Sequence, residues 1–71
     1  MSGEHKALNS MIGEYESPGE IGTELSRMGF DVLDVELGGV VVAGNSGVYF
    51  APITMDRDSG MAVLHGFKAE E

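Results

Sequence analysis

Residues 29–51 read GFDVLDVELGGVVVAGNSGVYFA and contain two glycine-rich turns between three apolar segments. In the first segment, residues 31–37, the apolar side chains of Leu33, Val35 and Leu37 alternate with acids. Alternation with a period of two is typical of a strand that has one face in water. We therefore predict a strand over residues 31–37 with these three side chains on its buried face.

The two turns predict the pairing of the next strands. Gly38 and Gly39 offer the positive φ angles that a tight hairpin needs. The runs 40–43 and 48–51 are rich in β-branched and aromatic residues and are predicted as strands, with residues 44–47 as the turn between them. Two successive hairpins make a β-meander.

Upstream of the meander the hydrophobic period changes to that of a helix. Residues 4–15 carry apolar side chains at i, i+3, i+4 and i+7, namely Leu8, Met11, Ile12 and Tyr15. This spacing places them on one face of an amphipathic helix. A first helix is therefore predicted over about residues 4–15.

A second helix is predicted over about residues 18–28. Ser17 is a capping residue, Pro18 occupies the first helical position and Glu20 the third, which together form a capping box. Gly29 supplies a left-handed C-terminal cap. The apolar stripe of this helix comprises Ile21, Leu25 and Met28.

Downstream of the meander, Pro52 lacks an amide hydrogen, so the strand ends near it or runs along an edge there. Residues 54–60 are polar and predict a loop, residues 61–67 predict a fourth strand, and residues 68–71 a mobile tail. The sequence thus predicts a single α+β domain over residues 1–71. In this fold two N-terminal helices pack on a four-stranded antiparallel β-meander, in the order ααββββ.

Small domains usually need an additional stabilising feature, such as a disulfide, a metal or a partner chain. This chain of 71 residues has no cysteine for a disulfide or a thiolate metal site. Oligomerisation is the stabilising feature that remains. The runs 40–42 and 48–51 are apolar at consecutive positions, so both faces of these strands are apolar while helices cover only one. A homodimer interface is therefore expected at Val40, Val42, Tyr49 and Phe50, with tolerated exposure as the alternative.

The net charge is −8, from 12 acidic against 4 basic residues. Nucleic acids and anionic membranes are bound through Lys and Arg, so direct binding to either is not expected. No run of about 20 apolar residues is present, and the first residues lack the apolar core of a signal peptide. The expected location is the cytoplasm, or the host cytoplasm if the chain is viral.

Motifs for catalysis or cofactor binding are weak. His5 and His65 are the only histidines, no nucleophile motif accompanies them, and no enzyme activity, metal or cofactor is expected. Residues 56–60 resemble the start of a calcium loop in the wrong register, and a turn explains them better. The spacing of Gly44 and Gly47 matches the G-x-x-G loop of KH nucleic-acid modules, but no basic residue adjoins it and a hairpin is the better interpretation.

Acids are concentrated between residues 14 and 36, where Arg27 is the only base. A dense negative surface attracts basic partners and raises the association rate, while an apolar patch at its centre supplies affinity. Solubility and salt adaptation explain the same acids without a partner. The candidate partner-binding residues are Glu14, Glu16, Glu20, Glu24, Asp31, Asp34 and Glu36.

These observations favour a small acidic interaction protein, an inhibitor or adaptor that docks on the basic surface of a nucleic-acid-handling protein. In size, charge and lack of catalytic residues it is similar to small phage-encoded inhibitors of host defence, including some anti-CRISPR proteins. This similarity is one of type and is carried by no sequence motif. The alternative is a homo-oligomeric structural or regulatory subunit whose acidity serves solubility or salt adaptation.

Overall fold

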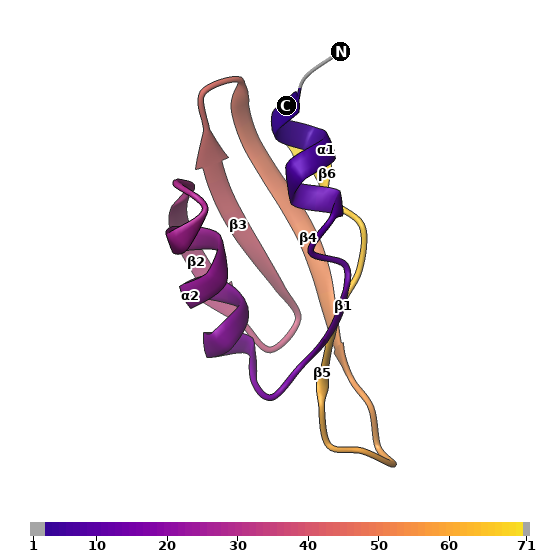
Figure 1. Cartoon of the computed structure of the whole chain (residues 1–71). Coiled ribbons are helices and arrows are strands. Elements are labelled where there is room, and N and C mark those ends of the chain that lie inside the picture. Colours follow the sequence, from indigo (N-terminus) through magenta and orange to yellow (C-terminus); the bar gives the residue numbers. More distant parts are fainter. Residues whose placement is uncertain (1–2, 71) are drawn as a thin grey trace.

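A computed structural model describes residues 3–70 of the chain, and Figure 1 shows their arrangement. Along these residues the elements are α1 (Gly3–Asn9), β1 (Gly13–Tyr15), α2 (Pro18–Arg27), β2 (Asp31–Glu36), β3 (Gly39–Gly44), β4 (Gly47–Met55), β5 (Ala62–Leu64) and β6 (Lys68–Glu70). The predicted order ααββββ is therefore wrong. A strand separates the two helices, and the antiparallel sheet has six strands instead of four.

The first helix ends six residues before the predicted boundary at Tyr15. After Asn9 the chain turns, and Gly13 takes a φ of 155°, a value that favours glycine. The following residues pair with β5, which satisfies their backbone groups in a ladder instead of a helix. Leu8 and Met11 are buried as the stripe predicts, whereas Ile12 is 51% exposed.

The second helix confirms the predicted caps. The Ser17 hydroxyl accepts a hydrogen bond from the Glu20 N–H (3.3 Å), and the Glu20 carboxylate accepts one from the Glu16 N–H (3.1 Å). At the other end Gly29 has a φ of 95°. The next amide, from Phe30, donates to the Leu25 carbonyl (3.1 Å), as in a Schellman motif.

The apolar stripe of α2 is only partly buried. Ile21 and Leu25 are fully inaccessible to solvent, but Met28 at the C-cap is 42% exposed. Gly22 lets the helix approach β2 closely, because a Cβ at that position would lie 3.1 Å from a methyl carbon of Val35.

Strands β2, β3 and β4 form the predicted meander, with different turns and lengths. The first turn is centred on Leu37 and Gly38, and neither Gly38 nor Gly39 has a positive φ, so that part of the prediction is wrong. Pro52 does not end β4, which continues to Met55 in the interior of the sheet. Pro52 has no amide hydrogen to donate, but its carbonyl still accepts a hydrogen bond from the His65 N–H (3.0 Å).

Of the predicted strand over residues 61–67, only β5 (Ala62–Leu64) forms, and β6 begins after the predicted range at Lys68. The two strands follow each other along one side of β4. Ile53 of β4 pairs with Leu64, whereas Phe50 pairs with Lys68, so one residue is inserted between the two pairings. The break directs Phe67 into the core, where it is 4% exposed. Of residues 68–71, predicted as a mobile tail, residues 68–70 form β6 instead, and Glu71 lies outside the described residues.

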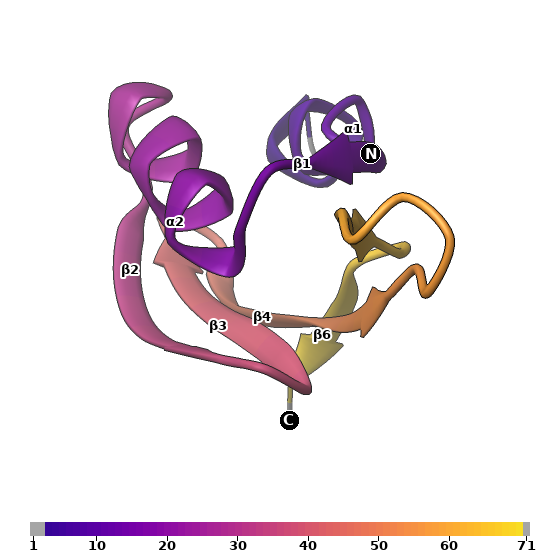
Figure 2. The ribbon, with the colours of Figure 1, turned by 90° about the horizontal axis from the view of Figure 1, so that it is seen from below.

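The sheet has the order β1-β5-β4-β3-β2, with β6 beside β4. Figure 2 shows that its strands follow an arc and that both helices lie on the inner side of the arc. The buried residues form one cluster on this side: Leu8, Met11, Ile21, Leu25, Val40, Val42, Tyr49, Ala51, Ile53, Ala62, Leu64 and Phe67. The outer, convex side has no covering helix among the described residues.

Within residues 3–70, neither α1 nor α2 has the length or apolar character that a membrane-spanning helix needs.

Candidate functional site

The outward-pointing side chains of β2, β3 and β4 form what we call the convex face. Residues opposite each other in an antiparallel pair point to the same side of the sheet. Val41 and Phe50 are opposite each other and half-buried, and Ala43 is opposite Val48 in the same way. Their strand neighbours Val40, Val42, Tyr49 and Ala51 point to the core.

An acidic row borders these apolar side chains on β2. Asp31, Asp34 and Glu36 are each exposed, and they lie opposite Ala43, Val41 and Gly39 of β3 respectively. Since partners share a face, the three carboxylates stand beside the apolar strip of the convex face. Their pairing places three negative charges next to partly exposed Val41 and Phe50.

A β-bulge produces this row. The register shifts between Val32 and Asp34, so Leu33 is an additional residue on β2. One additional residue reverses the side to which every later side chain points, which aligns Asp31 with Asp34 and Glu36. No local signal in the sequence marks the bulge.

The bulge also overturns the predicted faces of β2. Val35 packs against the core as predicted, but its companion on the inner side is Val32, and Leu33 and Leu37 are not buried. Leu33 is 55% exposed and Leu37 is 72% exposed. Strict alternation predicted the wrong buried set because it assumed an uninterrupted strand.

Phe50 is held in place by a glycine. A Cβ built on Gly39 would lie 2.6 Å from the Cε1 of the Phe50 ring and 3.0 Å from the Ala51 carbonyl oxygen. The ring therefore covers Gly39, which is itself buried. This contact fixes the aromatic side chain at the centre of the convex face.

The other four candidate acids lie elsewhere. Glu14 is on β1 opposite Val63, at the far end of the sheet from β2. Glu16 precedes α2, and Glu20 and Glu24 are on the helix itself. Burial, then the negative charges of Glu24 and Glu20, raise the pKa of Tyr15, whose hydroxyl donates to the Met11 carbonyl (2.6 Å).

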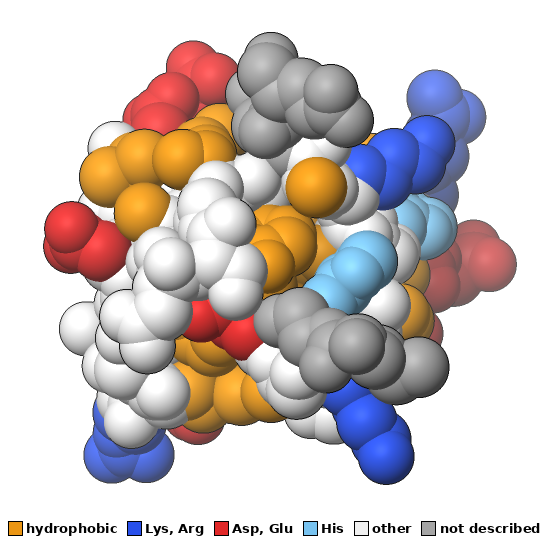
Figure 3. Space-filling view, turned by 90° about the horizontal axis from the view of Figure 1, so that it is seen from above, with side chains coloured by type: hydrophobic (Ala, Val, Ile, Leu, Met, Phe, Trp, Pro, Cys, Tyr) orange, Lys and Arg blue, Asp and Glu red, His pale blue; other side chains and the backbone are white. Residues whose placement is uncertain are grey.

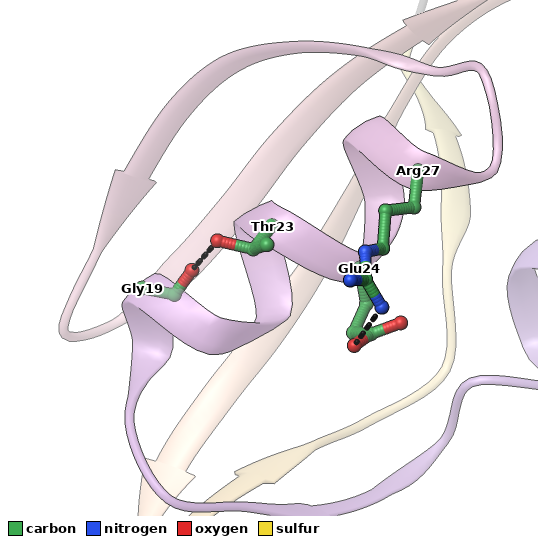
Figure 4. A network of polar contacts seen from close by, with 4 residues as sticks. All are labelled: Gly19, Thr23, Glu24 and Arg27. Atoms are coloured by element: carbon green, nitrogen blue, oxygen red, sulfur yellow. Dashed lines mark hydrogen bonds and ion pairs between the residues drawn. The ribbon is translucent and has the colours of Figure 1, made fainter.

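Two of these acids already have partners. Glu20 accepts the Glu16 N–H, and Glu24 forms an ion pair with Arg27 at 3.7 Å (Figure 4). The side chain of Arg27 is 74% exposed, so this pair contributes little to stability.

The seven acids thus do not form one surface. Three form the row on β2, and four lie around β1 and α2, on the other side of the sheet or at its opposite end. In the view from above, acidic side chains project from several sides of the molecule (Figure 3).

The residues expected at a homodimer interface lie mostly inside the protomer. Val40 and Val42 are fully inaccessible to solvent, and Tyr49 is 4% exposed. Phe50 remains partly exposed on the convex face. Both faces of these strands are therefore apolar for different reasons: the inner face is covered within the protomer, and the outer face carries the partly exposed Val41 and Phe50.

A carboxylate that the sequence did not single out binds the turn between β3 and β4. Glu4 of α1 accepts hydrogen bonds from the N–H groups of Asn45 (2.6 Å) and Ser46 (2.9 Å) and from the Tyr49 hydroxyl (3.0 Å). The Ser46 N–H above all, with smaller contributions from Asn45 and Tyr49, lowers the pKa of Glu4 in spite of some desolvation. The turn that matched G-x-x-G spacing thus holds a side chain of the same molecule.

Each histidine ring lies within hydrogen-bond distance of another group of the chain. The His5 Nε2 lies 2.9 Å from the Phe67 carbonyl oxygen, and the His65 Nε2 lies 2.8 Å from the Thr54 hydroxyl. Residues 56–60 form the turn that the sequence favoured, in which the Asp56 carboxylate accepts the Asp58 N–H (2.9 Å). Within residues 3–70 no group of three or more acidic or histidine side chains is arranged to hold a metal ion.

Two open grooves adjoin the sheet. One, of about 490 Å³, lies between α2 and β2 and is lined by Gly19, Gly22, Thr23, Ser26, Arg27 and Val32; we call it the edge groove. The other, of about 570 Å³, lies where β5 gives way to β6, and its lining includes Ile12, Pro52 and Phe67 with Lys68 and His65.

Comparison with known proteins gives no relative: no family model, curated protein or solved structure matches this chain.

Proposed function

We propose that this chain is an acidic protein–protein interaction module that docks its convex face on a basic surface of another protein. The observation that carries the proposal is the row of Asp31, Asp34 and Glu36 beside half-exposed Val41 and Phe50. Carboxylates steer a basic partner and fix its orientation, and apolar side chains next to them supply affinity on contact.

The favoured partner is a protein that handles nucleic acid. Such proteins carry clustered Lys and Arg, whose positive charges are complementary to an acidic surface. The net charge of −8 on the whole chain adds to this attraction. Docking there would compete with DNA or RNA for the same cationic side chains. The proposed role is accordingly that of an inhibitor or adaptor, without catalysis.

The acidic row on β2 suits this role better than the acids of α2. Glu20 is engaged in capping its helix, and Glu24 faces the cation of Arg27. The carboxylates of β2 instead adjoin the apolar centre of the convex face. A partner that needs both charge and apolar contact finds them together there.

The test compares two charge reversals of equal size. One bait carries Asp34→Lys and Glu36→Lys, a second carries Glu20→Lys and Glu24→Lys, and the third is the native chain. Each is immobilised and challenged with a panel of purified basic nucleic-acid-binding domains, and binding is measured at two salt concentrations. We expect the β2 reversal to weaken capture by about tenfold or more and the α2 reversal to leave it nearly unchanged.

Salt provides the second readout. Raising ionic strength well above 0.15 M shortens the screening length below about 8 Å and should release the partner. Equal loss of binding in both reversals would assign the effect to net charge alone and refute a site on the convex face. A salt-independent dimer that captures none of the domains would favour the homo-oligomeric subunit.

A further inference from the structure

Strand β2 ends the sheet. Among the described strands it pairs only with β3, so its other side presents backbone N–H and C=O groups to solvent. Such an edge is a template for a strand from another chain. The same region exposes Leu33 and Leu37, two of the large apolar side chains that the core leaves out.

The edge groove opens beside this strand. Its wall on α2 consists of Arg27 and four small residues, Gly19, Gly22, Thr23 and Ser26. Its lining on β2 is Val32, an inner-face residue. Side chains of an added strand would alternate between the convex face and the inner side, where the groove lies. Because most residues that line the groove on α2 are small, the groove has space for side chains of moderate size.

Charge determines what the added strand must carry. On the convex side it would lie next to the row of Asp31, Asp34 and Glu36, which favours Lys or Arg at alternate positions. On the inner side it would meet Val32 and the cation of Arg27, which favours apolar, uncharged residues. A second copy of this chain fits poorly, because antiparallel pairing of β2 with itself would bring two acidic rows together.

We infer that β2 is a docking site for an extended segment of a partner protein, in which Lys or Arg alternates with apolar residues, added as a seventh strand. This inference rests on the proposed function and specifies how the basic partner is held. The acidic row disfavours pairing of this edge with further copies of the chain, while leaving it open to a strand of opposite charge.

The test uses three peptides that carry the same set of side chains. The first alternates Lys and Val over about seven residues, the second has the same sequence with alternate backbone nitrogens methylated, and the third groups its Lys residues at one end. Binding to the ¹⁵N-labelled chain is followed by NMR, and amide exchange of β2 is measured with and without peptide.

We expect the alternating peptide to bind with its largest shifts in β2 and to slow exchange of the β2 amides. Methylation removes N–H donors without changing charge, so it should weaken binding by about tenfold or more. The grouped peptide should also bind more weakly, because its charges do not match the alternation of a strand.

Two variants separate this inference from the proposed function. Ser26→Phe fills the edge groove and should weaken the alternating peptide, with no change in charge. Asp34→Lys with Glu36→Lys should weaken all three peptides. If methylated and unmethylated peptides bind equally and the β2 reversal weakens both, strand addition is refuted and electrostatic docking stands. If the β2 reversal leaves peptide binding unchanged, both proposals fail. If the free chain forms a dimer that excludes the peptides, the strand site is refuted and a second copy of the chain is its occupant.

Discussion

The neighbouring glycines Gly38 and Gly39 provide the sharpest test of this fold. The sequence alone treats them as equal members of one turn, whereas the structure gives them different surroundings. A Cβ on Gly38 would meet nothing within 4 Å, but a Cβ on Gly39 would lie 2.6 Å from the Phe50 ring and 3.0 Å from the Ala51 carbonyl oxygen. Neither residue has a positive φ, so alanine introduces no left-handed strain at either position.

The magnitudes follow from these contacts. In Gly39→Ala the backbone oxygen cannot move away, and the ring must leave its position, an overpacking that typically costs about 1–3 kcal/mol. Gly38→Ala restricts the unfolded chain and should stabilise the protein by about 0.4–1 kcal/mol. Each kcal/mol shifts the Tm of a domain of this size by about 4–8 °C, so the two variants should differ by roughly 6 °C or more.

Thermal and urea unfolding, followed by circular dichroism, measure the difference. A double-mutant cycle with Phe50→Ala then isolates the contact: in that background Gly39→Ala should lose most of its cost, because the ring it displaces is absent. If Gly39→Ala is as stable as Gly38→Ala, or if the cost persists without the ring, the packing of Phe50 over Gly39 is refuted.

Two further predictions concern the core and the attachment of α1. Leu25→Ala removes a side chain with no solvent exposure and should cost about 2–5 kcal/mol by chemical denaturation, while Met28→Ala on the same helix should stay within about 1 kcal/mol; equal costs would contradict the packing of α2. The pKa of Glu4 is lowered in the fold, so its contribution to stability is present above the unfolded value near 4.5 and is lost as pH falls through the lower, folded value. Glu4→Gln should therefore flatten the decline of the unfolding free energy between pH 7 and pH 3, and an unchanged pH profile would show that the bonds from Ser46 and Asn45 to the carboxylate contribute nothing.

Local signals in the sequence predicted the parts of the structure that local chemistry controls. The caps of α2 depend on Ser17, Glu20 and Gly29, all within one turn of the helix ends, and they form as predicted. The existence of three paired strands within residues 31–51 follows from two turns and three β-rich runs, although β4 continues to Met55 beyond the predicted run. Concentration of acids was evident from the order of residues alone.

Long-range pairing decided the rest. Residues 13–15 continue a helical stripe, yet they form β1 because β5, almost fifty residues away, offers a ladder. Likewise β6 forms against β4, and Phe67 is buried where the backbone breaks between β5 and β6.

The candidate site shows the same division. Composition determined that this protein is strongly acidic, with apolar strands next to its acids, but not which carboxylates stand together. The bulge at Leu33 aligns Asp31 with Asp34 and Glu36, and the fold of α2 over the inner face sends Glu20 and Glu24 elsewhere. Side-chain direction in a strand has a period of two, so a single additional residue reverses it, and only the pairing with β3 reveals where that residue lies.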